Sequence, residues 1–524
     1  MKILISDPLH NEGINVLKDA NFEIIDASKK SKEQKVELAR SADAWIVRSG
    51  TVIDKSSLDN TLNLKIIGRA GVGVDNIDIS YATTKGIVVV NTPDVNTISA
   101  CEHTIGLMLS LSRNIPLGDN AIKSGDWNRH QLIGSELRSK TLGIIGLGKI
   151  GKELMERCKA FGMKIIAYDP YLKKEIFNNG LVSIVGLDEL LINSDYISVH
   201  IPLNDGTRNL INEKSFDLMK TTARIINVAR GGIINEKDLS KALIENKIAG
   251  AALDVFSIEP IEKNNPLLNA PNIILTPHLG ASTEEAKKGV SISVCNQIVE
   301  YLLNEKIANA LNFPISDKEI FKKIEYYLVL AEKMGYLQAQ INDEAIHSVK
   351  IECFGSIKES QAIMLAFLKG LLKERTPERV NYINVESLSK EFDIIIEHSF
   401  NSASISYDNL IKTSIKTRKN KTKISGSVFE GNRLRLVKIF GYEMDVNPNG
   451  NMLFINNNDV PGVIGMVGTV LGKSKINIRE FLLSKKESEP NAFSVVKLDS
   501  LASKEVLEKI NSFNEIKSII QLSC

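Results

Sequence analysis

The chain has 524 residues, of which 43% are hydrophobic and 24% charged, and its formal net charge is +2 at pH 7. This length is too great for one core and predicts roughly three or four domains. The small net charge excludes bulk electrostatic attraction to nucleic acid or to an anionic membrane, so any bound anion must be held by local sites.

The N-terminus predicts a first strand and no targeting segment, because MKILISDPLHNEG reaches Asp7 before the apolar run of a secretory signal can form. No stretch approaches the roughly 18 uncharged apolar residues that span a bilayer, so we expect a cytoplasmic location. Scattered cysteines match neither a metal site nor a disulfide framework, which favours a reducing compartment. They are Cys101, Cys158, Cys295, Cys353 and Cys524.

Short apolar runs alternate with amphipathic segments through the first 280 residues. The alternation predicts an α/β fold with two Rossmann-like, doubly wound parallel sheets. The first sheet would take KILIS, FEIID, AWIV and LKIIG, and the second TLGIIG, MKIIAYD, YISVH, RIINV, GAALDV and NIILTPH. Between the two sheets, helix-like periodicity over residues 97–124 predicts one long connecting helix.

The second half of the chain predicts two further α/β units. Residues 282–306 form a long helix in this prediction, with Ser282 as its N-cap, and return the chain to the first domain. NFPISD at 312–317 predicts a linker, and a mixed α/β region follows, whose basic run from Lys416 to Lys423 we expect to be a solvated loop. From residue 451 the order of elements predicts a βαββαβ, ferredoxin-like unit.

A glycine fingerprint follows the strand TLGII and precedes the helix KELMERCKAFG. Gly146 permits the tight turn, Gly148 lets the backbone approach a pyrophosphate, and Gly151 allows close helix packing. Asp169 ends the next strand, where a carboxylate accepts the ribose hydroxyls and repels a 2′-phosphate. The order strand, glycine loop, helix, strand and acid therefore predicts a dinucleotide site that favours NAD over NADP.

An arginine, a glutamate and a histidine downstream of this loop supply what hydride transfer on a 2-hydroxy or 2-keto acid requires. His278 in TPHLGAST can carry the proton, and Glu259 in DVFSIEP can orient and charge the imidazole. Arg230 in VARGGI can hold a carboxylate with its planar fork. Each residue taken singly has an ordinary structural explanation, so the prediction rests on the set.

These segments resemble the D-isomer-specific 2-hydroxyacid dehydrogenases over most of the first 313 residues. The resemblance is carried by RAGVGVDNIDI at 69–79, NTPDVNTISACEHTIGLML at 91–109, ELRSKTLGIIGLGKIG at 136–151 and INVARGGIINEKDL at 226–239. It implies that Arg230 binds substrate, Glu259 supports the histidine and His278 is the acid and base. It also implies NAD contacts at Val72, Lys149, Ile150, Asp169, Ile201, Val228, Ala229, Arg230, Asp254, His278, Leu279, Gly280 and Ala281, and no metal.

Beyond residue 313 the chain resembles the long form of this family, in which an intervening domain precedes a regulatory ACT domain. The segment from 425 to 465 closely resembles the junction between these two domains. The resemblance implies NAD-dependent oxidation of 3-phosphoglycerate to 3-phosphohydroxypyruvate, the first step of L-serine biosynthesis. The expected domains are a substrate-binding domain (1–98 and 285–313), a NAD-binding domain (99–284), an intervening domain (314–446) and an ACT domain (447–524).

A phosphorylated substrate needs more cationic contacts than Arg230 supplies. Arg48 and Arg69 each end an expected strand, where ligand-binding loops gather, and Asn96 resembles another family substrate contact. Arg129 and His130 are weaker candidates, since this region can approach a neighbouring subunit in the family. The resemblance implies a homodimer of the catalytic unit, extended to a tetramer through the tail.

The ACT resemblance also suggests an effector site. Asn457, Asp459 and Asn477 carry groups that can hold the ammonium and carboxylate of L-serine. Asn457 and Asp459 replace the His and Asn arrangement of some serine-inhibited relatives, so inhibition by serine stays open, as does reduction of 2-oxoglutarate. Two other classes of protein also stay open: a glyoxylate or hydroxypyruvate reductase, and a NAD-binding protein like the related corepressors.

Overall fold

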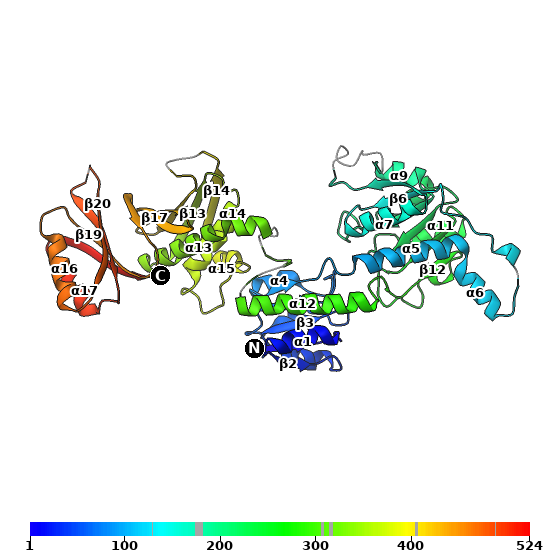
Figure 1. Cartoon of the computed structure of the whole chain (residues 1–524), viewed down its shortest axis with the longest axis horizontal. Coiled ribbons are helices and arrows are strands. Elements are labelled where there is room, and N and C mark those ends of the chain that lie inside the picture. Colours follow the sequence, from blue (N-terminus) through cyan, green and yellow to red (C-terminus); the bar gives the residue numbers. More distant parts are fainter. Residues whose placement is uncertain are drawn as a thin grey trace.

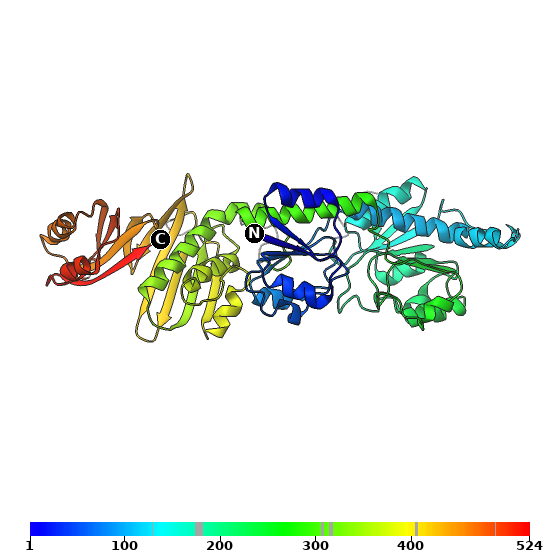
Figure 2. The ribbon, with the colours of Figure 1, turned by 90° about the horizontal axis from the view of Figure 1, so that it is seen from below.

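The computed structural model describes residues 1–127, 129–172, 182–304, 306, 309–313, 318–403, 407–487 and 489–524. Four sheets lie in a row along the molecule, in the order C-terminal four-stranded, six-stranded, N-terminal five-stranded and seven-stranded (Figures 1 and 2). The predicted fold class is confirmed. Within the described part of the chain, no helix is long and apolar enough to cross a membrane.

The first sheet is parallel throughout, with the strand order β2-β1-β3-β4-β5. Every residue of the central strand β3 is buried, as a strand covered on both faces requires. Helix α12 returns the chain to this sheet, since Val290, Val294 and Ile298 share a core with Ile3 and Ile5. The elements are β1 Lys2–Ile5, α1 Asn11–Asp19, β2 Glu23–Asp26, α2 Lys32–Ala39, β3 Ala44–Val47, α3 Lys55–Leu58, β4 Ile66–Arg69, α4 Ile79–Thr84, β5 Val88–Val90 and α12 Glu284–Asn304.

The second sheet is also parallel, with the order β12-β11-β10-β9-β6-β7-β8. The chain order reverses between β6 and β9, so the carboxyl ends of these strands form the switch point where open α/β sheets bind ligands. The elements are α5 Thr97–Arg113, α6 Ile115–Lys123, η1 Arg129–Gln131, β6 Thr141–Ile145, α7 Lys149–Ala160, β7 Lys164–Tyr168, β8 Ser183–Ile184, α9 Leu187–Asn193, β9 Tyr196–Val199, α10 Glu213–Leu218, β10 Arg224–Asn227, α11 Glu236–Ile244, β11 Gly250–Leu253, η2 Pro266–Asn269 and β12 Ile273–Leu275.

Two helix predictions are wrong in detail. Residues 97–124 form two helices, because Asn114 adopts a left-handed conformation with φ of 53° between α5 and α6. Asparagine tolerates this conformation, and Pro116 fits the first turn of the new helix. The N-cap of α12 is Thr283 rather than Ser282, since the Ala286 amide donates to Thr283 Oγ1 at 3.1 Å. Residues 314–317 of the expected linker lie outside the described residues.

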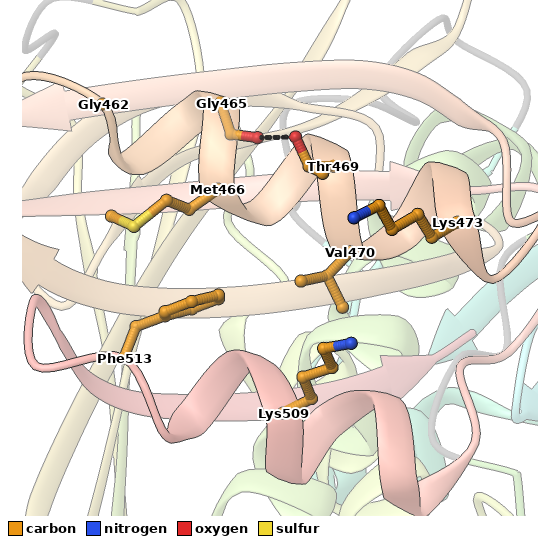
Figure 3. Close-up of a pocket in the computed structure, with 8 residues that line it drawn as sticks. All are labelled: Gly462, Gly465, Met466, Thr469, Val470, Lys473, Lys509 and Phe513. Atoms are coloured by element: carbon orange, nitrogen blue, oxygen red, sulfur yellow. Dashed lines mark hydrogen bonds between the residues drawn. The ribbon is translucent and has the colours of Figure 1, made fainter.

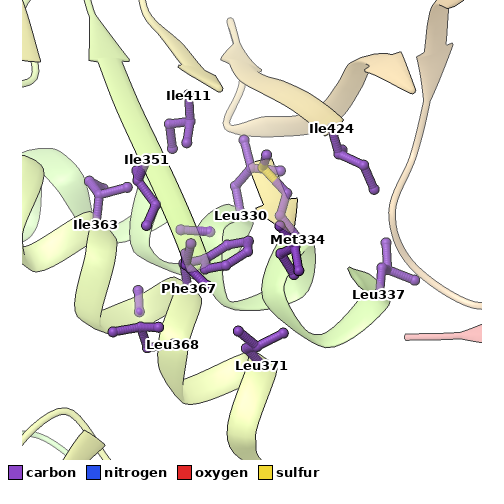
Figure 4. Close-up of a cluster of buried hydrophobic side chains, with 14 of the residues drawn as sticks. Leu330, Met334, Leu337, Ile351, Ile363, Phe367, Leu368, Leu371, Ile411 and Ile424 are labelled. Carbon is purple, nitrogen blue, oxygen red and sulfur yellow. The ribbon is translucent and has the colours of Figure 1, made fainter. Parts of the chain in front are cut away.

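The third sheet is mixed, with the order β14-β13-β15-β16-β17-β18 and only β13 and β14 parallel. Helices α13 and α14 cover it, and Phe367 and Met334 pack between them and the sheet (Figure 4). The elements are α13 Lys318–Ile341, β13 Ile346–Phe354, α14 Ser360–Leu372, α15 Val385–Glu391, β14 Ile395–Asn401, β15 Leu410–Thr417, β16 Lys421–Phe429, β17 Arg433–Ile439 and β18 Tyr442–Val446.

The basic run is part of a β-hairpin, which corrects the expected loop, although its lysines are exposed as expected. Lys416 lies in β15, Lys421 and Lys423 lie in β16, and the Thr417 amide donates to Asn420 O to close the turn between them. Cross-strand pairing of Lys416 with Lys421 continues the antiparallel ladder to its end. The run is therefore a β-hairpin, because ladder hydrogen bonds outweigh the low strand propensity of its charged residues.

The C-terminal sheet is antiparallel with the order β20-β21-β19-β22, and α16 and α17 lie on one of its faces (Figure 1). Its elements are β19 Asn451–Asn458, α16 Val463–Lys473, β20 Ile478–Lys485, β21 Asn491–Leu498, α17 Lys504–Asn511 and β22 Ile516–Ser523. The other face packs on the third sheet, where the ring of Phe493 lies 5.4 Å from those of both Phe440 and Tyr442. Gln340 of α13 also exchanges two hydrogen bonds with the Ser523 backbone, at 3.0 and 2.9 Å. The last two sheets therefore share one core.

The third sheet contacts the first through the segment before α15. Asn381 Nδ2 donates to Gly86 O at 2.6 Å, and Arg379 Nη2 donates to the hydroxyl of Tyr301 on α12 at 3.2 Å. Ile383 is buried in the core of the first sheet. Side chains of the C-terminal half thus reach the edge of the sheet that carries β4 and β5.

We expect Phe493→Ala to loosen the joint between the last two sheets. Phe493 is 3% exposed, and loss of a buried phenylalanine ring costs about 3 to 5 kcal/mol. Hydrogen exchange of the whole chain, followed by mass spectrometry, should show faster exchange in β18 and β21 and unchanged exchange in the first two sheets. Phe392→Ala, at a side chain 45% exposed, is the matched control. Unchanged protection of β18 and β21 would mean that the two sheets do not depend on this ring.

Candidate active site

The glycine loop between β6 and α7 has the geometry of a dinucleotide site. Gly146 has φ of 95°, and a Cβ atom there would lie 2.6 Å from His200 O. A Cβ atom on Gly151 would overlap Gly146 O, so only glycine lets the helix approach the loop. At Gly148, by contrast, a Cβ atom would meet no described atom within 4 Å. The amino end of α7 is therefore open to a pyrophosphate.

Asp169 lies beside this loop, where the sequence predicted it. Its Oδ2 atom accepts from the Leu147 amide at 3.0 Å, and its Oδ1 atom accepts from the Tyr171 amide at 3.0 Å. Each carboxylate oxygen keeps a further lone pair, so the side chain can still accept hydrogen bonds from ribose hydroxyls. The glycine loop and Asp169 together fit NAD.

We expect Asp169→Ser to weaken NAD binding and to reduce the preference for NAD over NADP. Loss of hydrogen bonds to a charged group, worth about 1.5 to 3 kcal/mol, should raise the KM for NAD by roughly 10- to 100-fold. Steady-state kcat/KM values with each dinucleotide measure both effects. Asp188→Ser, at an exposed aspartate in α9, is the control. An unchanged NAD to NADP ratio would remove Asp169 from cofactor selection.

The structure brings His278 and Glu259 together. His278 Nδ1 lies 2.6 Å from Glu259 Oε2, and Glu259 Oε1 accepts from the Phe256 amide at 3.0 Å. Burial alone would raise the pKa of the Glu259 carboxyl, but the hydrogen bonds from His278 and Phe256 hold this pKa below its usual range. Glu259 is therefore a carboxylate at neutral pH and fixes the orientation of the imidazole, leaving Nε2 for substrate.

Glu259→Gln should lower activity and change its pH dependence. The neutral amide cannot stabilise a protonated imidazole, so we expect kcat to fall by about tenfold or more, as a part of the roughly 10² to 10⁴ that a positioned acid or base contributes. The acidic limb of the kcat/KM profile for oxidation should move to lower pH, because the histidine then binds its proton less tightly. Assays from about pH 5 to about pH 10, a range that includes the usual titration of histidine, test both effects. An unmoved limb would contradict the coupling.

Asp254 organises the backbone around His278. The His278 residue has φ of 53°, a left-handed conformation, and its amide donates to Asp254 O at 2.9 Å. The Asp254 carboxylate is fully buried and accepts from Thr276 Oγ1 at 2.6 Å and from the amides of Leu279 and Gly280 at 2.7 and 2.8 Å. The family-based NAD contact at Asp254 stays a prediction, since its side chain has no exposed surface here.

Arg230 is placed by a close approach of two backbone segments. A Cβ atom on Gly231 would overlap Phe256 O, so glycine allows the segment after β10 to lie against the segment that leads to Glu259. Asn227 clamps the turn, because its Nδ2 donates to Arg230 O at 2.8 Å. The guanidinium extends toward the first sheet, where its Nε lies 3.3 Å from Asp75 Oδ2. Sequence reasoning missed Asp75, although it stands inside the motif at 69–79.

Arg69 lies close to both Arg48 and Arg230. Burial and the positive charges of Arg230 and Arg48 lower the pKa of Arg69 to about 10. Asp7 holds the loop after β3, since its carboxylate accepts from the Arg48 amide at 2.6 Å. Within the described chain, Arg69 Nε and Asn96 Oδ1 are buried without a hydrogen-bond partner. Converging arginines with an unsatisfied donor, Arg69 Nε, are what a site for a multiply charged anion requires, whereas Asn96 Oδ1 is an acceptor that suits a hydroxyl of the substrate.

The remaining predicted cofactor contacts lie at the carboxyl ends of strands or at the start of α7. Val228 and Ala229 follow β10, Ile201 follows β9, and Val72 follows β4. Their side chains are partly exposed, as are those of Ile150 and Ala281, and Leu279 is 40% exposed. Lys149 forms an ion pair with Asp94, which joins the start of α7 to the segment before α5.

Other candidates are not brought to this site within one chain. Arg129 and His130 form an exposed 3₁₀ turn after α6, which projects from the end of the molecule (Figure 1). In the C-terminal sheet, Asn457 is 1% exposed and accepts from Ser494 Oγ at 3.4 Å, while Asp459 pairs with Lys485 at 3.3 Å.

Asn477 lies far from Asn457 within one chain. It precedes Ile478, which pairs with Leu498, whereas Asn457 pairs with Ala492 at the other end of β21. A separate groove between α16 and α17 is lined by Met466, Val470, Phe513 and two lysines (Figure 3). None of the three predicted effector residues lines that groove. A site that unites them would need a second chain.

Comparisons with known proteins agree with this geometry. Residues 105–280 match the model of the D-isomer specific 2-hydroxyacid dehydrogenase, NAD binding domain, and residues 323–440 match that of the D-3-phosphoglycerate dehydrogenase intervening domain. The chain is 41% identical to D-3-phosphoglycerate dehydrogenase of Methanocaldococcus jannaschii over 99% of both proteins, and 37% identical to that of Bacillus subtilis over 99% of this chain and 98% of the relative.

Among solved structures, the chain resembles D-lactate dehydrogenase from Aquifex aeolicus complexed with NAD and lactic acid. The TM-score is 0.51 at 28% identity, over 58% of this chain and 95% of that one. A glyoxylate reductase from Paecilomyes thermophila gives a TM-score of 0.55 at 30% identity, over 59% and 98% of the two chains. Both likenesses cover little more than half of this chain.

The fold and the site define a NAD-dependent dehydrogenase of D-2-hydroxy acids. Relatives that span the whole chain match both its catalytic part and its C-terminal domains. The chain belongs to the D-3-phosphoglycerate dehydrogenase family.

Proposed function

We propose that the chain oxidises 3-phosphoglycerate to 3-phosphohydroxypyruvate, the first step of L-serine biosynthesis. The observations that carry the proposal are the arginine cluster of Arg48, Arg69 and Arg230 and the His278–Glu259 pair. The close approach of Gly231 to Phe256 connects them, because Gly231 follows Arg230 and the Phe256 amide donates to Glu259. Three cations match a substrate that bears both a carboxylate and a phosphate. The match to D-3-phosphoglycerate dehydrogenases over the full chain supports this substrate and disfavours a glyoxylate or hydroxypyruvate reductase and a corepressor.

Each residue has a defined task in the proposed reaction. Arg230 holds the substrate carboxylate and polarises the neighbouring carbon–oxygen bond. Arg48 and Arg69 hold the phosphate, and Asn96 is a further contact of the substrate. His278 Nε2 accepts the proton of the C2 hydroxyl, and Glu259 stabilises the imidazolium that results. Bound NAD, held by the glycine loop and Asp169, supplies the hydride acceptor.

The domain division expected from sequence serves this function. Helix α12 shares a core with the first sheet, which supports joining residues 285–313 to residues 1–98 as one substrate-binding domain. The family matches at 105–280 and 323–440 fall within the NAD-binding and intervening domains, 99–284 and 314–446. Residues 447–524 then form the ACT domain.

A homodimer through the α6 region belongs to the same proposal. No residue of α6 is buried, and five apolar side chains in and after it are more than half exposed. They are Ile115, Leu117, Ile122, Trp127 and Ile133. Burial of this surface against a second chain would bring Arg129 and His130 toward the site of that chain, and pairing of ACT domains would make a tetramer.

Serine binding requires such pairing of ACT domains. Asn457 and Asp459 lie at one end of the C-terminal sheet and Asn477 at the other, so a ligand that touches all three must lie between two chains. The amide and carboxylate groups suit the ammonium and carboxylate of L-serine. In this proposal the effector acts only on the oligomer.

The test is NAD reduction followed by absorbance, with hydrazine present to trap the keto product. We expect turnover with 3-phosphoglycerate, at least about 100-fold lower kcat/KM with D-glycerate because the phosphate contacts are lost, and suppression by L-serine. Equal rates with both acids would overturn the phosphate assignment. Absence of turnover with either acid, in a protein that binds NAD, would overturn the enzymatic proposal. Parallel assays with 2-oxoglutarate and NADH define the breadth of substrates.

A further inference from the structure

A second histidine meets the buried carboxylate that organises the His278 loop. His103 lies on α5, with its side chain 22% exposed, and its Nε2 atom is 3.2 Å from Asp254 Oδ1 and 3.3 Å from Thr276 Oγ1. Thr276 gives its only hydroxyl proton to Asp254 at 2.6 Å, so its oxygen can only accept from His103. The arrangement therefore requires a proton on His103 Nε2.

Asp254 connects this histidine to His278 through short polar contacts. The carboxylate accepts from His103, Thr276 and the amides of Leu279 and Gly280, and the Asp254 carbonyl accepts from the His278 amide. Because the carboxylate is 0% exposed, no solvent molecule can replace a lost donor without rearrangement. The left-handed backbone conformation of His278 therefore depends on the Asp254 carboxylate keeping all of its hydrogen-bond donors.

His103 also lies on the helix that joins the two parallel sheets. Asn96, a proposed substrate contact, directly precedes α5, and Ser99 on the same helix lies 2.9 Å from Thr283, the N-cap of α12. Both connections between the sheets therefore meet near Asp254. A movement of α5 on substrate binding would move His103 and so change the hydrogen bond that Asp254 accepts from it.

We propose that His103 is a positioning residue, which acts through Asp254 to hold the backbone of residues 276–280 and so aims His278 at the substrate. The inference rests on the proposed acid and base role of His278. It assigns to α5 a function beyond connecting the sheets, since the helix that carries the substrate contact then also sets the placement of the proton acceptor.

The test compares His103→Leu with His103→Gln in the full-length enzyme. Leucine removes the donor, and we expect kcat to fall by about 10- to 100-fold, as small misplacements of a catalytic group do, with the KM for NAD changed less than about twofold. Glutamine can donate an amide proton to Asp254 and should restore most of the rate. The deuterium isotope effect on kcat, measured with 3-phosphoglycerate labelled at C2, should rise in His103→Leu, because the chemical step becomes slower.

Two further variants separate the possible failures. His347→Leu, at an exposed histidine of β13, controls for the substitution itself and should match wild type. If His278→Ala retains full turnover, the proposed function of His278 fails first. If His278→Ala is inactive and His103→Leu is fully active, this inference alone is wrong. Equal loss in the leucine and glutamine variants, with weaker NAD binding in both, would show a purely structural role and also overturn it.

Discussion

Replacement of His278 by alanine is expected to abolish turnover while NAD binding persists. The imidazole is the proposed proton acceptor, and a positioned acid or base contributes roughly 10² to 10⁴ in rate. Its partner Glu259 would remain, but a carboxylate is a poor base for an alcohol. Single-turnover absorbance measures the chemical step, and calorimetric titration measures NAD affinity.

The matched control for this variant is His347→Ala, which removes an exposed imidazole far from the site along the chain. Its turnover should equal that of wild type. Partial recovery of His278→Ala by added imidazole would strengthen the assignment, because the lost base would then be supplied from solution. Turnover of His278→Ala within about tenfold of wild type would contradict it, since this is below the smallest contribution expected of an acid or base.

The second large effect is expected from Arg230→Lys. Lysine keeps the positive charge but loses the planar fork that can hold a carboxylate with two hydrogen bonds, and it cannot keep the contact of Nε with Asp75. Loss of hydrogen bonds between charged groups, about 1.5 to 3 kcal/mol, should lower kcat/KM for 3-phosphoglycerate by roughly 10- to 100-fold. The KM for NAD should change little.

Arg224→Lys provides a control on the same strand. Arg224 is the first residue of β10, whereas Arg230 follows its last residue, so the two side chains lie at opposite ends of the sheet. Steady-state assays over a range of both substrates should leave Arg224→Lys close to wild type. If the two variants behave alike, the guanidinium of Arg230 does not contact the substrate carboxylate.

The triple arginine cluster explains how one site can select a phosphorylated acid. Burial and the charges of its neighbours lower the pKa of Arg69 to about 10, so it stays protonated at neutral pH, and its Nε has no hydrogen-bond partner among the described residues. A bound phosphate would offset the repulsion among Arg48, Arg69 and Arg230 and stabilise all three charges. An unphosphorylated acid leaves this repulsion uncompensated. In the proposed site, substrate selection is therefore a property of the cluster and not of a single arginine.

The sequence determined the local features of this protein. Buried parallel strands appear as short apolar runs, and the glycine loop with Asp169 can be recognised because strand, turn and helix follow one another along the chain. The proposal of Arg230, Glu259 and His278 as catalytic residues followed from chemistry and resemblance. The sequence-based helix boundaries were wrong at Asn114, whose backbone angle ends α5, and at Ser282, because the hydroxyl of the next residue caps α12. Hydrophobic periodicity contains neither kind of information.

Only the tertiary structure decided which distant residues meet. Arg230 contacts Asp75, and His103 contacts Asp254, although each pair is more than a hundred residues apart in the chain. The last two sheets share one core that combines side chains from separate strands. Such contacts depend on the crossing of strands and helices, which a local pattern does not encode. The residue types therefore determine which chemistry is possible, while packing determines where each side chain points.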